Sequence, residues 1–150
     1  MRSTRWMLAA VAAMTMTMVL GATPVAAQSR GYVVIVNESN FLTNISTPEL
    51  GRLFMKRTTR WTTGQTVTPL DLTASSAVRD SFSQQVFRKS PAQVKADWQA
   101  VLAAGRGMPP MEAPNEQLVV AFVRANPGAI AYVSPDTPLG AGVRAVRVRN

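Results

Sequence analysis

A turn rich in hydroxyl groups, between a predicted strand at residues 67–70 and a predicted helix, is the part of the sequence best suited to bind a ligand. The turn covers residues 71–76, and its hydroxyl-bearing side chains are those of Thr73, Ser75 and Ser76. Because a helix N-terminus has unpaired backbone N–H groups and partial positive charge, a small anion could bind there. With Ser75 as the N-cap, the first helical turn contains Arg79 and no acidic residue, so an anion would also complement this cation.

The same turn allows an interpretation without a ligand. Serine is a common N-cap residue, since its side chain accepts a hydrogen bond from the backbone of the first helical turn. Ser75 would then only cap the helix, and Arg79 would pair with the adjacent Asp80 or with solvent. The sequence supports both interpretations about equally.

Polar residues in three other loops could extend this site. Asn37 and Ser39 follow an apolar run at residues 32–36, and open α/β sheets usually bind ligands at the carboxyl ends of their strands. Arg106 lies between two glycines, where a helix stop with a solvated arginine is the simpler explanation. Trp61 follows several basic residues and could either stack on a ligand or cover the edge of the core.

The composition excludes most catalytic chemistry. The chain has no His and no Cys, so the usual transition-metal ligands, a Ser-His triad and a cysteine nucleophile are all missing. The 8 acidic residues lie far apart in the sequence, and no local pattern indicates a glycosidase with two carboxylates. We therefore predict a protein that is not an enzyme and needs no metal ion or cofactor.

N-cap residues and apolar periodicity predict four helices that would position these loops. One begins at Ser46, where Glu49 completes a capping box, and ends near residues 56–57. Another begins at Ser90 with the same capping pattern, and the remaining two follow the hydroxyl-rich turn and the N-cap Asn115. Their expected buried residues are Leu50, Leu53 and Phe54; Val78, Phe82 and Val86; Val94, Trp98, Val101 and Leu102; and Leu118, Val119, Phe122 and Val123.

Four strands are predicted to alternate with the helices. The continuous apolar run at residues 32–36 is typical of a central strand covered on both faces, and two more strands are expected at residues 67–70 and 129–133. At residues 143–148 valines alternate with arginine, as in a half-exposed strand. The pattern predicts an α/β domain with a mostly parallel or mixed sheet flanked by about four helices.

The N-terminal segment has the pattern of a cleavable signal peptide. Arg2 and Arg5 precede an apolar stretch, and small residues fit a cleavage site before Gln28. We therefore expect a signal peptide at residues 1–27 and one periplasmic domain at residues 28–150, without stable membrane insertion. Removing Arg2 and Arg5 from the 16 basic residues leaves 14 against 8 acidic ones, a formal charge of +6. The basic residues are scattered, so nucleic acid is not an expected partner.

Several of these segments together resemble a known family. They are residues 50–57 followed by Trp61, residues 67–71, Arg79 with Phe82, Trp98, residues 105–110, and residues 126–133, which include Pro-Gly-Ala-Ile-x-Tyr-Val. In order and spacing they look like the short relatives of phosphate ABC transporter substrate-binding proteins. The resemblance implies a single lobe of the periplasmic-binding-protein fold that binds phosphate or another small oxyanion. It also implies an ABC transporter or another periplasmic protein as partner.

The hydroxyl-rich turn departs from the pattern of that family. Ser75 matches a binding serine of the family, but Ser76 stands where glycine is expected, and Ala77 replaces a threonine. Asp71 stands close to the place of a binding arginine and would repel phosphate unless Arg79 offsets its charge. The resemblance therefore leaves two main hypotheses: an oxyanion-binding module, or a non-catalytic interaction or scaffold protein that has lost ligand binding. An enzyme is the third and weakest.

Overall fold

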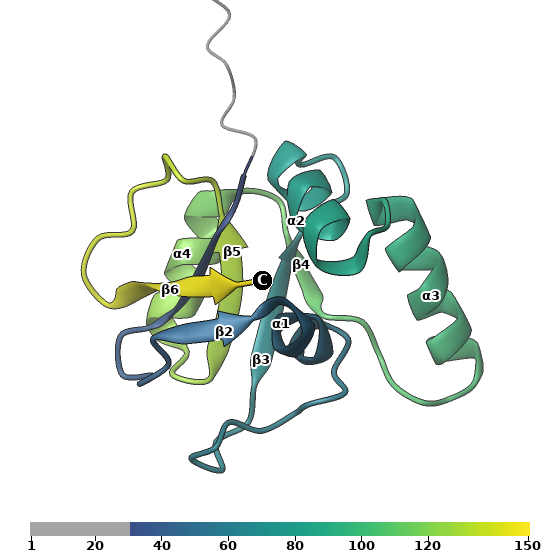
Figure 1. Ribbon diagram of the computed structural model, residues 1–150, viewed down its shortest axis with the longest axis horizontal. Helices are drawn as coiled ribbons and strands as arrows, with labels where there is room; N and C mark the ends of the chain where they lie inside the picture. Colours follow the sequence, from purple (N-terminus) through teal and green to yellow (C-terminus); the bar gives the residue numbers. More distant parts are fainter. Residues whose placement is uncertain (1–30) are drawn as a thin grey trace, which may run out of the picture.

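Runs of valine, isoleucine, leucine and tyrosine assemble into one six-stranded sheet in the computed structural model, which describes residues 31–150 (Figure 1). The strands are β1 (Val33–Asn37), β2 (Asn44–Ser46), β3 (Thr68–Leu72), β4 (Met111–Ala113), β5 (Ala129–Val133) and β6 (Val143–Arg149). The helices are α1 (Thr47–Phe54), α2 (Ala77–Phe87), α3 (Pro91–Ala103) and α4 (Glu116–Ala125). The predicted α/β class with four flanking helices is confirmed. The predicted signal peptide and its cleavage before Gln28 lie outside the described residues.

The direction of the strands decides which loops can meet. The sheet order is β2-β6-β1-β5-β3-β4, and β3 runs parallel to both β4 and β5. β1 lies in the interior of the sheet, as predicted, but it runs antiparallel to its two neighbours β5 and β6. The carboxyl ends of β3, β4 and β5 therefore lie at one edge of the sheet, and the carboxyl end of β1 lies at the opposite edge.

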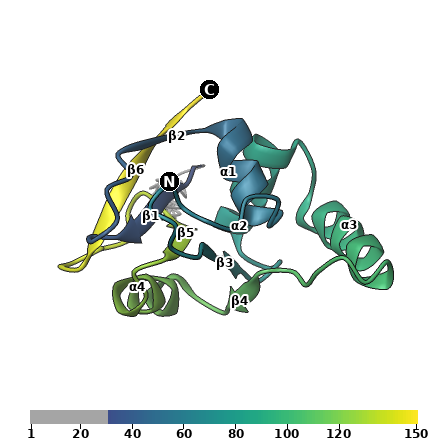
Figure 2. The ribbon, with the colours of Figure 1, turned by 90° about the horizontal axis from the view of Figure 1, so that it is seen from below.

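Helices cover both faces of this sheet. α1 and α2 lie on one face, where they contact β3, and α4 lies on the other face against β5 and β1 (Figure 2). α3 packs on α2 and is the outermost helix, joined to β4 by residues 104–110. Within residues 31–150, no helix is long and apolar enough to cross a membrane.

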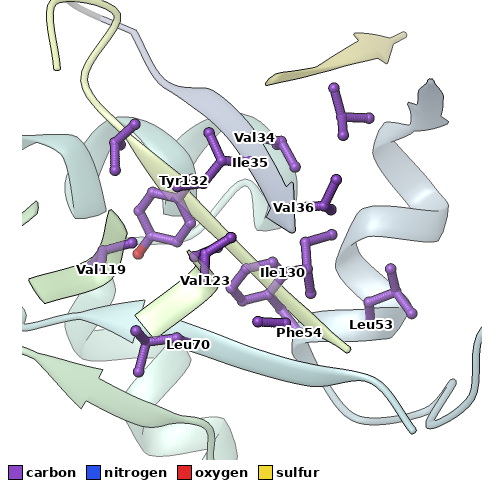
Figure 3. Packing of buried hydrophobic residues seen from close by; sticks show 14 of the residues in the cluster. Val34, Ile35, Val36, Leu53, Phe54, Leu70, Val119, Val123, Ile130 and Tyr132 are labelled. Carbon is purple, nitrogen blue, oxygen red and sulfur yellow. The ribbon is translucent and has the colours of Figure 1, made fainter. Parts of the chain in front are cut away.

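Side chains from the sheet and its helices form one central core (Figure 3). Phe82 of α2 stacks on Tyr132 of β5, with ring centroids 3.8 Å apart and an interplanar angle of 5°. Phe54 of α1 packs against both rings at a tilt. Since these aromatic side chains come from β5 and two helices, their packing fixes how α1 and α2 lie on the sheet.

Two leucines that were predicted to be buried are exposed. Leu102 is 53% exposed, because α3 packs on α2 instead of on the sheet and its last turn faces solvent. Leu118 is 51% exposed, because the buried stripe of α4 is Val119, Val120 and Val123. β2 and β4 were not predicted, because they have three residues each and are too short to show a strand period.

Candidate functional site

A pocket of about 490 Å³ lies where β3, β4 and β5 end. We call it the carboxyl-edge pocket. Its polar lining consists of Thr73, Ser75 and Ser76 after β3, Asn115, Glu116 and Gln117 at the start of α4, and Ser134, Asp136 and Thr137 after β5. The structure thus brings together the three hydroxyl-bearing residues that were predicted from the turn. This edge is also where open α/β sheets usually bind ligands.

Two helix N-termini border the carboxyl-edge pocket. α2 is capped by Ser76, whose side chain accepts a hydrogen bond from Arg79 N at 3.3 Å. The predicted N-cap Ser75 is therefore wrong by one residue; its exposed hydroxyl instead lies 3.4 Å from that of Thr73. α4 is capped by Asn115, whose Oδ1 accepts from Leu118 N at 2.9 Å. Both helix ends direct partial positive charge toward the pocket.

A carboxylate at the start of α4 occupies two hydrogen-bond donors in the segment that follows β5. Glu116 Oε2 accepts a hydrogen bond from Ser134 N at 2.5 Å and another from the hydroxyl of Thr137. Glu116 is the first residue of α4, where negative charge is favourable next to the helix dipole. The pocket is also lined by Asp136, and its lining within the described residues includes no Lys or Arg. An oxyanion in this pocket would therefore meet two acidic residues and no cation.

Arg79 does not line the carboxyl-edge pocket. It is 4% exposed, and its Nη1 lies 2.6 Å from Asp71 Oδ1 and donates a 2.5 Å hydrogen bond to Leu72 O. Glu112 Oε1 lies 3.6 Å from the same nitrogen. The described partners of Arg79 are thus Asp71 and Glu112, and not the adjacent Asp80 of the interpretation without a ligand. The physical reason is that Asp71 is buried beside α2, so its carboxylate is the nearest counter-ion for Arg79.

Asp71 and Tyr132 complete this buried network. Asp71 Oδ1 also accepts hydrogen bonds from the hydroxyl of Tyr132 and, at 3.0 Å, from Leu72 N. Burial raises the pKa of Asp71 to about 6, and the charge of Arg79 and the two hydrogen bonds offset this effect only in part. Burial and the neighbouring Asp71 carboxylate also raise the pKa of Tyr132. The sequence had suggested that Arg79 could offset the charge of Asp71, but no pattern singled out Tyr132 or Glu112 as a partner.

Asn37 and Ser39 lie at the opposite edge of the sheet and do not join the carboxyl-edge pocket. Their predicted place beside the hydroxyl-rich turn is wrong, because β1 runs against β3 and β5. Asn37 Nδ2 donates to Val123 O at 3.0 Å and to Arg124 O at 2.8 Å, so it ties β1 to the C-terminus of α4. Its Oδ1 accepts from the backbone N and the hydroxyl of Ser39. Both residues therefore have structural partners.

The structure also places the two remaining candidates. Trp61 is half-buried against the core, and its Nε1 donates to Gly128 O at 3.1 Å, which agrees with the interpretation as a cover for the core edge. Arg106 is exposed on the loop between α3 and β4. Neither residue lines the carboxyl-edge pocket.

Comparison with solved structures finds the same fold in phosphate-binding proteins. An ABC-type phosphate transport receptor from Vibrio cholerae has a TM-score of 0.62 and 20% identity, with 79% of this chain and 46% of the receptor covered. A possible phosphate binding protein from Planctomyces limnophilus has a TM-score of 0.60 and 15% identity, with 80% and 42% covered. A putative phosphate ABC transporter substrate-binding protein with bound phosphate, from Clostridium perfringens, has a TM-score of 0.61 and 18% identity, with 79% and 44% covered.

These likenesses concern the fold. The chain spans less than half the length of the proteins that it matches, as expected for a relative with a single lobe. No protein-family model matches the sequence. No curated protein matches it either.

Proposed function

We propose that this protein is an exported, non-catalytic interaction module built on a solute-binding fold, and that it does not carry phosphate. The observation that carries the proposal is the position of Glu116, whose carboxylate accepts from Ser134 N and the hydroxyl of Thr137. Ser134 and Thr137 line the carboxyl-edge pocket, where an oxyanion could use the same two donors. Because Glu116 already accepts from both, they are not available to a ligand.

The state of Arg79 supports the same conclusion. Its guanidinium pairs with Asp71 and lies outside the carboxyl-edge pocket, so it does not neutralise a phosphate bound in that pocket. A phosphate anion in the carboxyl-edge pocket would also be repelled by the charge of Glu116, and an open pocket gives water access to every contact. Both effects weaken phosphate binding by this chain.

We assign the module to the periplasm, because the sequence predicts a signal peptide before Gln28. Its partner is another exported protein or an ABC transporter, and it binds at the carboxyl edge of the sheet. The exposed Ser75 and the open pocket beside it provide the surface for this contact. No catalytic step is assigned to the module.

Calorimetric titration tests the loss of phosphate binding. We expect the native protein to release no heat of binding with phosphate or sulfate up to about 10 mM. Glu116→Ala removes the internal carboxylate and frees the two donors, so it should acquire weak sulfate binding. Glu38→Ala, which removes an exposed acid at the opposite edge of the sheet, serves as the control for the change in net charge.

Photo-crosslinking tests the interaction surface. A crosslinking residue at Ser75 should give one adduct of defined mass in the exported fraction. The same residue at Thr63, an exposed position in the loop before β3 and so at the opposite edge, should give none. Equal adducts at both positions, or none at position 75, would contradict the proposed surface.

An oxyanion carrier remains the second candidate. It is favoured by the gathering of the Thr73, Ser75 and Ser76 hydroxyls at the N-terminus of α2, in a fold shared with phosphate-binding proteins. If the native protein binds phosphate in the titration and Ser75→Ala weakens that binding, this candidate replaces the interaction module.

A further inference from the structure

A second pocket, of about 390 Å³, lies between α3 and the β3–β4 side of the sheet. We call it the α3 pocket. Its lining consists of Lys95, Trp98, Gln99 and Leu102 from α3, Pro109 and Pro110 from the following loop, Asp71 from β3, Arg79 from α2 and Glu112 from β4. It shares no residue with the carboxyl-edge pocket. Its volume falls within the range of about 300–1,000 Å³ that is typical of small-molecule sites.

One wall of the α3 pocket is apolar and is not used by the central core. Trp98 is 7% exposed, yet it does not belong to the core cluster, because α3 packs on α2 away from the sheet. Leu102, which the sequence pattern predicts to be buried, lines the same pocket with half of its surface exposed. The apolar stripe of α3 therefore faces the pocket, where an apolar group of a ligand could cover it.

The lining of the α3 pocket also offers both signs of charge. Arg79 lines the pocket, and its described side-chain contacts, with Asp71, Glu112 and Leu72 O, are all made through Nη1. Asp71 likewise makes its described contacts through Oδ1. Glu112 is the register partner of Asp71 on β4, and Lys95 is exposed on α3. The lining thus has two carboxylates and two cations, so its net charge is zero.

We propose that the α3 pocket binds a free amino acid with a branched aliphatic side chain. The carboxylate of the amino acid is held by Arg79 and Lys95, and its ammonium group is held by Glu112 and Asp71. The aliphatic side chain lies against Trp98 and Leu102. A simple anion would be attracted by the two bases but repelled by the two acids, and the reverse holds for a simple cation, so a zwitterion matches the charges best.

The test is a titration of the full chain with L-leucine, followed by calorimetry and by the fluorescence of Trp98. Since the ligand would contact the indole ring, we expect a saturable change in emission that is absent in Trp98→Phe. Two probes have the same side chain but one charge each: 4-methylpentanoate lacks the ammonium group, and 3-methylbutylamine lacks the carboxylate. Each should bind at least about tenfold more weakly than leucine, the factor expected for a lost charge-assisted contact.

Exposed residues of the pocket provide variants that should still fold. Lys95→Gln and Glu112→Gln should each weaken leucine binding by about tenfold or more. Arg106→Gln and Asp80→Asn, which change exposed charges outside the pocket, should leave the binding unchanged. Circular dichroism checks that all four variants are folded.

Three results would overturn the proposal: no binding of leucine by the native chain up to about 10 mM, equal binding of 4-methylpentanoate, or binding that is insensitive to Lys95→Gln and Glu112→Gln. The proposed loss of phosphate binding concerns the carboxyl-edge pocket and is measured with other ligands. The two proposals can therefore fail independently.

Discussion

At the scale of single residues, Asp71 is the buried acid that organises the network beside α2. The resemblance noted in the sequence implies an arginine near this place, whereas this chain has an aspartate with Arg79 Nη1 at 2.6 Å from its Oδ1. The hydroxyl of Tyr132 donates to the same carboxylate oxygen of Asp71. The charge of Asp71 is therefore balanced within the protein by Arg79.

The raised pKa of Asp71 predicts a characteristic dependence of stability on pH. Because the pKa rises from 3.8 to about 6, the folded protein holds the proton more tightly than the unfolded chain does. The resulting stabilisation is fully present below pH 3.8 and is lost as the pH rises through about 6. It amounts to about 3 kcal/mol.

Urea unfolding across this pH range, on the native protein and on Asp71→Asn, measures the effect. The difference between the two free energies of unfolding should change by about 3 kcal/mol between pH 3.5 and 7, with the native protein losing stability relative to the variant as the pH rises. A difference that stays constant would show that Asp71 titrates with its ordinary pKa.

A double-mutant cycle tests the buried ion pair of Asp71 and Arg79. Arg79→Met leaves the Asp71 carboxylate buried without its counter-ion and should cost about 3–5 kcal/mol at neutral pH. Asp71→Leu combined with Arg79→Met should recover most of this loss, since a buried ion pair can be replaced by apolar side chains at little cost. Asp71→Arg, which restores the arginine of the resembling family, should destabilise the protein, because two guanidinium groups would then be buried together. If the double variant were as unstable as Arg79→Met alone, the pair would contribute through packing and not through charge.

At the scale of secondary-structure elements, α3 differs from the other helices. Capping residues define its start, with Ser90 and Gln93 forming the predicted capping box. It packs mainly on α2, and the side that includes Val94 and Trp98 is buried. α1, α2 and α4 are each anchored on the sheet, and their position is fixed by strands as well as by helices.

Two substitutions on α3 separate the buried side from the exposed side. Trp98→Ala should cost about 3–5 kcal/mol, because a large buried side chain is removed. Leu102→Ala should cost less than about 1 kcal/mol, since 53% of Leu102 already faces solvent. Chemical denaturation gives both values, and similar losses for the two variants would mean that the whole stripe is buried, as the sequence pattern suggests.

At the scale of the whole molecule, the antiparallel course of β1 separates two groups of polar residues. Thr73, Ser75 and Ser76 line the carboxyl-edge pocket, and Asn37 and Ser39 lie at the other end of the sheet. Asn37 instead connects β1 with the last turn of α4 through Val123 O and Arg124 O. The two edges therefore differ: one contains the carboxyl-edge pocket, and at the other Asn37 joins β1 to α4.

Asn37→Ala tests this division. The change removes two hydrogen bonds to carbonyl groups of α4 and should lower the free energy of unfolding by about 1–3 kcal/mol. It should leave every adduct formed from Ser75 unchanged, since the carboxyl-edge pocket is remote from it. Loss of the adduct in a folded Asn37→Ala protein would place Asn37 in the binding surface after all.

The sequence by itself determined most elements and the α/β class. Capping boxes are local, so Ser46 and Ser90 marked the starts of α1 and α3 correctly. Apolar runs and alternation identified β1, β5 and β6 for the same reason: their period is visible within a few residues. The hydroxyl-rich turn could also be found in this way, because it follows a strand directly and begins a helix.

Only the tertiary structure decided which of these pieces meet. The direction of β1 depends on its pairing with β5 and β6, which lie about a hundred residues away in the chain, and no local pattern encodes it. The pairing of Arg79 with Asp71 and the contact of Glu116 with Ser134 and Thr137 likewise need the packed sheet to bring them together. Charge is a property of a residue, but long-range packing sets the partner that neutralises a buried charge. For this reason the candidate site could be located from the sequence, while its charge balance could not.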